Sequence, residues 1–211
     1  MRLEPGAYFM LSLGMGGDVR YLEPGQERPE KRRLMLEFDD GSALSIDFWW
    51  FGYAHATDDL ASHKMTAALG LNPLDEGEFT YERFSGLVKG SRKTIKSILL
   101  DQKLVAGIGN VYVQDILFVA RLHPDRKASQ LKDEEIKALY AAIKSNLKAA
   151  VKMRGLKFEK DLYGQPGEME HQHFLVGYKE GQPCPECGAI IEKIKTGSTA
   201  SYICPRCQQI R

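Results

Sequence analysis

Four cysteines near the end of the chain constrain its fold more than any other feature of the sequence. They follow the spacing C-x2-C-x16-C-x2-C and are Cys184, Cys187, Cys204 and Cys207. Two such pairs supply four thiolates, which is the ligand set of a closed, tetrahedral structural zinc site. Because all four ligands come from the protein, no coordination position stays open for water or substrate. We therefore predict one Zn²⁺ with a structural rather than a catalytic role.

A pair of disulfides is the alternative for these cysteines. Disulfides require an oxidising compartment, and no secretory signal opens the chain. Paired C-x2-C knuckles are moreover typical of zinc sites. Residues 189–194 and 200–203 have the pattern of two short strands, which predicts a zinc-held hairpin whose folding depends on the metal.

The charge of the chain is informative only locally. The 211 residues are 43% hydrophobic and carry a formal net charge of +1, which is ordinary for one large or two modest domains. A neutral total can hide a charged patch, and residues 88–103 carry five cations against Asp101 alone. The cations are Lys89, Arg92, Lys93, Lys96 and Lys103. This segment is the best candidate for a phosphate-binding surface, with a solvated helix face as the alternative. No apolar run is long enough for a membrane span.

The hydrophobic period changes once along the chain. Apolar residues alternate over 34–38 and 44–50, on either side of Asp39-Asp40-Gly41, which predicts a β-hairpin. After residue 73 the pattern becomes helical, so that the boundary between the two parts lies near residues 70–78. Helices are expected over residues 79–89, 94–102, 110–122 and 136–151.

The turn between the second and third of these helices has the composition of an anion-binding loop. It runs DQKLVAGIGN from Asp101 to Asn110. Gly107 and Gly109 allow a ligand to approach the backbone closely, and Asn110 lies where free N–H groups begin the next helix. A plain helix-capping turn is the alternative, because G-x-G-N alone is a weak motif.

The longest stretch of combined motifs resembles a known family. DQKLVAGIGNVYVQDILFVARLHPDRKASQL (101–131), followed by the CPEC and CPRC knuckles, is similar to the formamidopyrimidine-DNA glycosylase and endonuclease VIII family of base-excision repair enzymes. LGMGG (13–17) resembles a loop of the family's β-sandwich, and DFWWFG (47–52) resembles its D-P-R-R-F-G loop. The resemblance implies an α+β fold with three parts. These are a partial β-sandwich over 1–74, a helical domain with a helix, two-turn, helix element over 75–165, and a loop with a four-cysteine zinc finger over 166–211.

The resemblance also implies a function and a set of site residues. It implies a glycosylase and abasic-site lyase that binds damaged double-stranded DNA, in the cytoplasm with the chromosome. Lys96 and Asn110, with Gly109 in the same turn, match residues that bind the phosphates around the damaged nucleotide. Met15 and Phe51 match side chains that fill the base stack when the lesion is extruded, which offsets part of the unstacking cost. Burial in a β-core is the alternative for Met15 and Phe51.

The first residues depart from the family pattern. Family members begin with a proline followed by glutamate, and the proline amine attacks the sugar to form a Schiff base. This chain begins Met1-Arg2-Leu3, at a point that aligns with the middle of the sandwich. We therefore expect no catalytic residue within these 211 residues, and self-association through the truncated sandwich. The alternatives are a glycosylase whose N-terminal segment is absent from this sequence, a non-catalytic DNA-binding remnant, and a zinc-hairpin interaction module with no DNA role.

Two further departures affect the DNA contacts. Trp49 and Trp50 stand where the family usually has two arginines. An indole offers a large face for stacking on a base, which is one role for Trp49. Alternation with Ile46 and Phe48 predicts that Trp50 faces the core. Thr199 stands where the family usually carries a phosphate-binding arginine, and its hydroxyl can bond a phosphate only without charge, so weaker DNA binding is expected.

Overall fold

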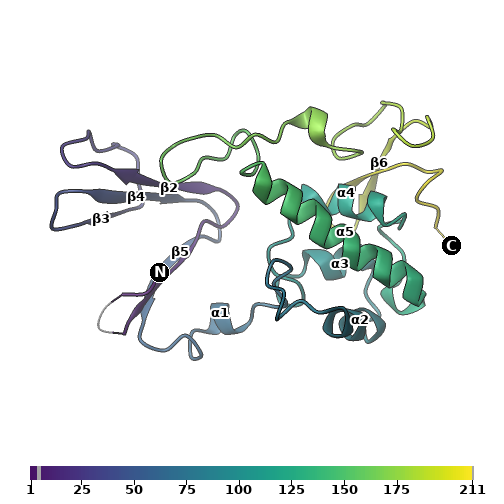
Figure 1. The fold of residues 1–211 in the computed structure, drawn as a ribbon, viewed down its shortest axis with the longest axis horizontal. Coiled ribbons are helices and arrows are strands. Elements are labelled where there is room, and N and C mark those ends of the chain that lie inside the picture. The colour runs from purple at the N-terminus through teal and green to yellow at the C-terminus, as the bar shows by residue number, and fades with distance from the viewer. Residues whose placement is uncertain (4–5, 211) are drawn as a thin grey trace. The chain divides into compact units, whose positions relative to one another are not determined.

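The computed structural model describes residues 1–3 and 6–210, which form two compact units. The N-terminal unit comprises Met1–Ala67 with Met153–Met169, and the helical unit comprises Ala68–Lys152 with Glu170–Arg211. The strands of the first and the helices of the second confirm the expected α+β class (Figure 1). Within the described residues, no helix has both the length and the apolar character that crossing a bilayer requires.

The N-terminal unit contains two small antiparallel sheets. Its elements are β1 (Tyr8–Ser12), β2 (Gly17–Leu22), β3 (Leu34–Glu37), β4 (Ala43–Phe48), β5 (Tyr53–Thr57) and α1 (Lys64–Ala67). One sheet pairs β1 with β5, and the other has the order β2-β4-β3. The predicted hairpin is confirmed as β3–β4, with Leu36 opposite Leu44. Its turn is closed by the Asp40 carboxylate, which accepts from the Ser42 N–H at 2.9 Å.

The prediction that Trp50 faces the core is wrong. Strand β4 ends at Phe48, so the alternation on which the prediction depended stops before Trp50. The chain then turns, with Phe51 at a φ of 67° and the Gly52 N–H donating to Trp49 O at 2.8 Å. The Trp50 side chain is 78% exposed as a result.

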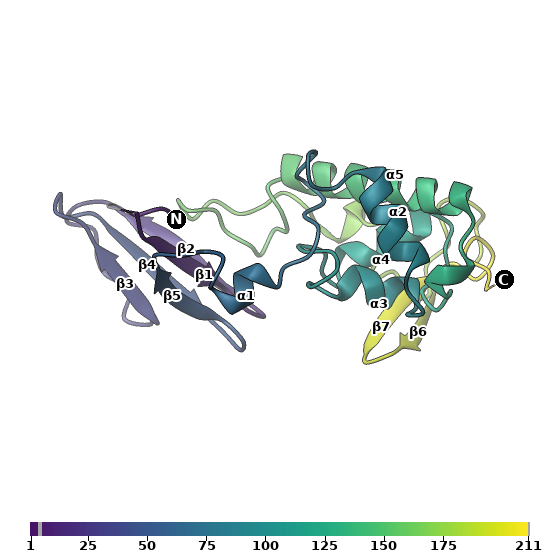
Figure 2. The same ribbon diagram turned by 90° about the horizontal axis from the view of Figure 1, so that it is seen from below.

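The helical unit contains the four helices that the sequence predicts. The first three are shorter than expected, whereas the last extends beyond the expected 136–151 at both ends. Its elements are α2 (Tyr81–Lys89), α3 (Ile95–Leu100), α4 (Tyr112–Val119), η1 (Ala128–Gln130), α5 (Asp133–Lys152), η2 (His171–His173), β6 (Glu192–Thr196) and β7 (Thr199–Ile203). Thr80 and Thr94 begin α2 and α3 as N-caps, because each hydroxyl accepts a backbone N–H of the first turn. Strands β6 and β7 form the predicted hairpin, called here the zinc hairpin, which lies beside α3 and α4 (Figure 2).

The buried apolar residues of the helical unit form two clusters. The larger cluster joins α2, α3, α4 and α5 around fully buried side chains such as Phe79, Phe84 and Ile98. The smaller cluster surrounds the cysteines and consists of Phe118, Val176, Cys184, Ile191, Tyr202 and Cys204. Because Phe118 belongs to α4, the zinc hairpin packs directly against the helices.

These contacts group the segments differently from the sequence pattern. Residues 153–169 follow α5 but belong to the N-terminal unit, where Leu162 O accepts the Tyr21 N–H at 2.7 Å. The zinc hairpin and the helices belong to one compact unit. The expected boundaries at 74 and 165 thus divide the chain by sequence pattern, whereas packing joins the zinc finger to the helical part.

Candidate zinc centre and nucleic-acid interface

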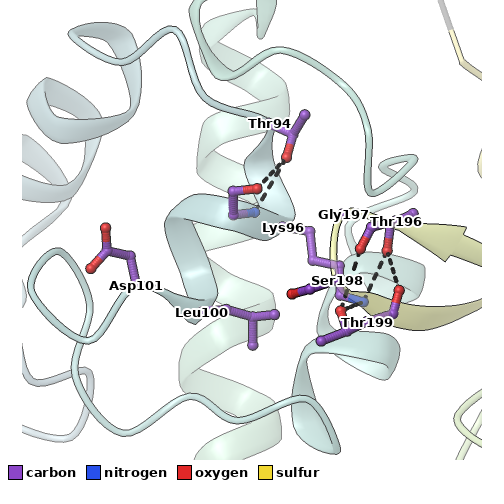
Figure 3. Close-up of a pocket in the computed structure, with 9 residues that line it drawn as sticks. Thr94, Lys96, Leu100, Asp101, Thr196, Gly197, Ser198 and Thr199 are labelled. Carbon is purple, nitrogen blue, oxygen red and sulfur yellow. Dashed lines mark hydrogen bonds between the residues drawn. The ribbon is translucent and has the colours of Figure 1, made fainter.

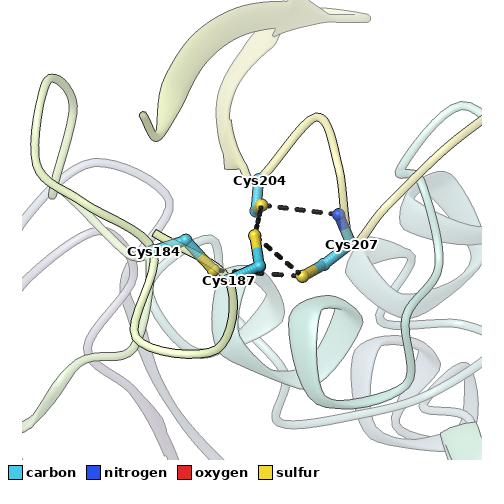
Figure 4. Close-up of side chains that lie close together, drawn as sticks. All are labelled: Cys184, Cys187, Cys204 and Cys207. Carbon is cyan, nitrogen blue, oxygen red and sulfur yellow. Dashed lines mark hydrogen bonds between the residues drawn. The ribbon is translucent and has the colours of Figure 1, made fainter. Parts of the chain in front are cut away.

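The four cysteine side chains converge on one point (Figure 4). Their Sγ atoms lie within 4.8 Å of one another, and three of the separations are 3.4, 3.6 and 3.9 Å. Four ligands at a Zn–S distance of about 2.3 Å around a tetrahedral ion lie about 3.8 Å apart, so these thiols fit zinc. A disulfide needs sulfurs only about 2.05 Å apart. All four cysteines are free, which excludes the disulfide alternative.

The two knuckles are shaped by their own backbones. In the first, the Cys184 N–H donates to Ala189 O at 2.8 Å and the Gly188 N–H donates to Cys184 O at 2.9 Å. Gly188 has a φ of 73°, a left-handed conformation that favours glycine. In the second, the Cys207 N–H points at the sulfur of Cys204, 3.4 Å away.

Lys96 reaches the zinc hairpin from helix α3. Its ammonium donates to Thr199 Oγ1 at 2.8 Å, Ser201 Oγ at 2.8 Å, Thr196 Oγ1 at 3.0 Å and Ala200 O at 2.7 Å. The residue is only 3% exposed. Figure 3 shows its side chain directed at the hairpin hydroxyls, at the edge of a pocket of about 240 Å³.

The acceptors around Lys96 are all uncharged. Burial lowers the pKa of Lys96 from 10.5 to about 8, and the more distant carboxylate of Asp125 opposes this shift. The uncharged hydroxyl and carbonyl acceptors thus compensate only part of the cost of burying this cation, and no carboxylate among the described residues contacts it. The side chain that the family resemblance assigns to phosphate binding is held inside the protein by the hairpin.

The rest of the basic segment 88–103 is partly neutralised. Lys89 pairs with Asp133 at 2.6 Å, and Lys93 pairs with Asp101 at 2.8 Å. Within the part of the chain that the structure describes, the remaining exposed cations of this segment without an ion pair are Arg92 and Lys103. Four of the five cations are thus on the surface, and two of these four have no ion pair among the described residues.

The turn that ends at Asn110 is tied to the zinc hairpin by one buried amide. Gln114 on α4 is 2% exposed, and its Nε2 donates to Asn110 O at 2.8 Å and to Ala200 O at 3.3 Å. Its Oε1 accepts the Tyr202 N–H at 3.1 Å. The sequence analysis missed Gln114, although a polar pair inside the apolar helix YVQDILFV is a signal for buried hydrogen bonding.

The second member of that pair fixes the segment that leads to the zinc knuckles. The Asp115 carboxylate accepts the backbone N–H groups of Leu175 at 2.7 Å and of Val176 and Gly177 at 2.9 Å. Asp115 is 6% exposed, so these three donors compensate its burial. Helix α4 thereby holds both sides of the zinc finger.

The loop before Asn110 and the tip of the zinc hairpin both have exposed residues. The loop is braced by Gln102, whose Oε1 accepts the Gly107 N–H at 2.8 Å. Gly109 is exposed, and a Cβ added there would meet no atom within 4 Å. At the hairpin, Thr199 is half-buried because its hydroxyl accepts from Lys96. The exposed residues of the hairpin tip are Lys195, Gly197 and Ser198.

Three further predicted site residues lie on turns of the N-terminal unit. Met15 is 71% exposed, Phe51 is 81% exposed and Trp49 is 62% exposed. Burial of Met15 and Phe51 in a β-core, the alternative interpretation, is therefore excluded. The two turns that carry these side chains are joined by a hydrogen bond from the Met15 N–H to Trp50 O at 3.0 Å.

The helical unit has a glycine turn before α4 and a four-cysteine hairpin packed on the same helix. This combination indicates a zinc-finger protein. Residues 69–160 match the "Formamidopyrimidine-DNA glycosylase H2TH domain" family, and residues 181–210 match the "Zinc finger found in FPG and IleRS". The formamidopyrimidine-DNA glycosylase of Roseiflexus sp. is 37% identical over 98% of this chain and 76% of its own length. That of Gluconobacter oxydans is also 37% identical, over 99% of this chain and 78% of its own.

Solved structures agree with these sequence matches. A Lactococcus lactis Fpg in complex with DNA that contains an abasic site has a TM-score of 0.84 and 30% identity, covering 97% of this chain and 76% of that one. A complex of the same protein with DNA containing FAPY-dG also has a TM-score of 0.84, at 31% identity, over 98% and 77% of the two chains. The chain belongs to the formamidopyrimidine-DNA glycosylase family. The cysteine cluster is its zinc-finger site and holds one structural zinc.

Replacing a zinc ligand is expected to disturb α3 as well as the hairpin. Cys184→Ser should bind less than one zinc per chain and loosen β6 and β7, which supply every protein acceptor of Lys96. Metal analysis and amide hydrogen exchange measure both effects. Ser198→Ala, at the exposed tip, is the control that keeps one zinc. Protected α3 amides in a Cys184→Ser protein with a disordered hairpin would contradict this coupling.

Lys96 is expected to give stability a distinct pH dependence. Its folded pKa of about 8 lies below its ordinary value of 10.5, so between these values the unfolded chain binds more protons at this group than the folded chain. The free energy of unfolding that Lys96 contributes therefore rises with pH over this window and is constant below it. The Tm difference between the unmodified protein and Lys96→Met should grow from about pH 8 to 10.5. Lys103→Met, at an exposed lysine, should show no such trend, and a constant difference for Lys96→Met would disprove the shift.

Proposed function

We propose that this protein is a DNA-binding protein of base-excision repair whose helical unit holds the phosphates of damaged duplex DNA. The observation that carries the proposal is the joint between the Asn110 turn and the zinc hairpin, both hydrogen bonded to the buried Gln114 amide. Two anion-accepting surfaces fixed relative to each other suit a polyanion of regular spacing. The complexes of the Lactococcus lactis relative with abasic-site and FAPY-dG DNA support the same choice of ligand.

Each predicted residue has a defined part in this proposal. Gly109 lets the phosphate approach the backbone, and Asn110 donates its side-chain amide to a phosphate oxygen. Thr199 and the hairpin tip contact a second phosphate. Lys96 acts through the hairpin, since its ammonium already has four protein acceptors.

The N-terminal unit contributes the contacts to bases. Met15, Phe51 and Trp49 are large, exposed apolar side chains on fixed turns. We propose that they fill the space left in the stack when a damaged nucleotide is extruded, a role that needs exposed side chains. Self-association through the sheets of this unit stays a prediction.

DNA binding should depend on salt and on the residues of the proposed surface. Affinity for duplex DNA should fall steeply as salt rises, because bound counterions are released. Asn110→Ala should weaken binding about tenfold, the size of one hydrogen bond to a charged group. Asn110→Asp, of nearly equal size, should weaken it further because its carboxylate repels phosphate. Fluorescence anisotropy of labelled duplex measures these affinities.

The salt dependence of DNA affinity separates residues that contact phosphate directly from residues that only hold the hairpin in place. Lys195→Ala should lower the slope of log affinity against log salt by about one unit. Lys96→Met should lower affinity while leaving that slope unchanged, if Lys96 acts through the hairpin. Lys137→Ala, on the exposed side of α5, is the charge-matched control. Equal slopes for Lys195→Ala and Lys137→Ala would count against the hairpin as part of the surface.

The 211-residue polypeptide is expected to bind abasic DNA without forming a Schiff base. The family resemblance assigns catalysis to the free amine of a proline followed by glutamate, and both Pro-Glu dipeptides of these 211 residues, at 29–30 and 185–186, are internal and have no free amine. Borohydride treatment should yield no covalent complex, whereas a lyase-active relative under the same conditions should be trapped. Trapping that disappears in Lys96→Met would identify the amine of lowered pKa as a nucleophile and overturn this expectation.

A further inference from the structure

Both tryptophans of the chain lie in one exposed apolar patch of the N-terminal unit. Trp49 is 62% exposed and Trp50 is 78% exposed, and they adjoin Phe51 in sequence. Met15, 71% exposed, lies against them on the neighbouring turn. Large apolar side chains gathered on a protein surface mark a binding site more often than an accident of folding.

The turns that carry the patch are fixed in position. The Trp49 N–H donates to Gly16 O at 2.9 Å, and the Met15 N–H donates to Trp50 O at 3.0 Å. Gly14 has a φ of 67°, and a Cβ there would lie 2.3 Å from Trp50 O, so only glycine allows the turns to approach this closely. The tryptophans are therefore presented to solvent by an ordered backbone.

The two indoles border a pocket of about 530 Å³, with Met15 and Arg33 as its other lining residues. One face of the Trp49 ring lies against Gly16, where an added Cβ would be 3.4 Å from the ring. Because Gly16 covers only one face of the Trp49 ring, the other face is exposed and available for stacking. The Arg33 side chain is 63% exposed, and its Nε lies 3.8 Å from the Asp47 carboxylate, so the positive charge at this pocket is partly neutralised.

We infer that this pocket takes one unstacked nucleobase of a DNA strand and does so with little regard to base identity. The inference rests on the proposed DNA-binding function. A flat aromatic base suits the free indole faces, and stacking is tolerant of sequence because every base has a π-face. The exposed Arg33 guanidinium attracts the backbone phosphate of the same strand in competition with its partner Asp47.

The lack of base discrimination follows from the chemistry of the lining. An indole contributes one N–H donor and no acceptor, a guanidinium contributes donors only, and the Met15 sulfur is a weak acceptor. Base edges are told apart by patterns of donors and acceptors. The one side chain of this lining that could read such a pattern is Arg33, and its guanidinium is already paired with the Asp47 carboxylate at 3.8 Å. DNA with an unpaired base is thus the preferred ligand of this unit, whichever base is unpaired.

Tryptophan fluorescence tests this contact directly, because the only two tryptophans of the sequence line the pocket. The full chain is titrated with a labelled duplex that contains a single unpaired nucleotide and with its fully paired counterpart. Label anisotropy reports binding, and indole emission reports stacking. The unpaired duplex should quench the emission in step with the anisotropy, and the paired duplex should quench it much less. The four unpaired bases should give affinities within about threefold, far less than base-specific readout gives.

Matched variants separate stacking from apolar contact. Trp49→Leu and Trp50→Leu keep an apolar side chain and should each weaken binding to the unpaired duplex about 5- to 100-fold, while Trp49→Phe and Trp50→Phe retain most of the affinity. Phe158→Leu replaces an exposed aromatic residue outside the pocket and should change nothing. Both tryptophans are exposed, so these variants should fold, which circular dichroism verifies.

The outcomes distinguish this inference from the proposed function. Anisotropy that shows DNA binding without a change in indole emission would overturn the pocket and leave DNA binding intact. Equal quenching by paired and unpaired duplexes, or a strong preference for one base, would also overturn it. Absence of any anisotropy change at low salt would disprove both the inference and the proposed function.

Discussion

The contact between the Lys96 ammonium and the zinc hairpin is the interaction on which the helical unit depends. Removing a cation from water is costly, and no carboxylate among the described residues contacts this one. Four oxygen atoms within 3.0 Å offset part of this cost, and all four belong to the hairpin, although burial still lowers the pKa of Lys96. The zinc ligands hold the two strands that carry these oxygens. The metal therefore stabilises α3, which is distant from it in sequence, as well as the short hairpin that could not fold alone.

Helix α4 also binds the zinc finger through buried polar side chains, one of them neutral and one negatively charged. Gln114 bonds the hairpin and the Asn110 turn, Asp115 bonds the segment that leads to the first knuckle, and Phe118 enters the apolar cluster around the cysteines. These contacts fix the start of α4 and the hairpin strand β7 relative to each other. A ligand that touches both surfaces meets a geometry that is already formed, so little ordering is required on binding.

The sequence predicts the local features of this fold and misses the long-range polar contacts. The β3–β4 hairpin, the main helices and the cysteine site follow from alternation, helical period and ligand spacing, all of which act over short distances in the chain. Trp50 was misplaced because alternation says nothing about where a strand ends, and β4 ends at Phe48. The position of Lys96 was beyond local reasoning, since its partners follow it by 100 to 105 residues. In sequence it is one of five neighbouring cations, and the local pattern does not distinguish it from the exposed ones; only the family resemblance singles it out, as a phosphate ligand.

The contacts of Lys96 change the role that the sequence suggests for Thr199. The family usually carries an arginine at this position, and from sequence alone the threonine is a phosphate contact without its charge. In the structure the Thr199 hydroxyl accepts from the Lys96 ammonium at 2.8 Å. An arginine has no acceptor to offer and would add a second cation beside a buried one. In this chain the buried Lys96 is joined to Thr199 by a hydrogen bond that an arginine at position 199 could not accept. The Thr199 hydroxyl is, in this chain, one of the four oxygen atoms that dock the hairpin onto α3.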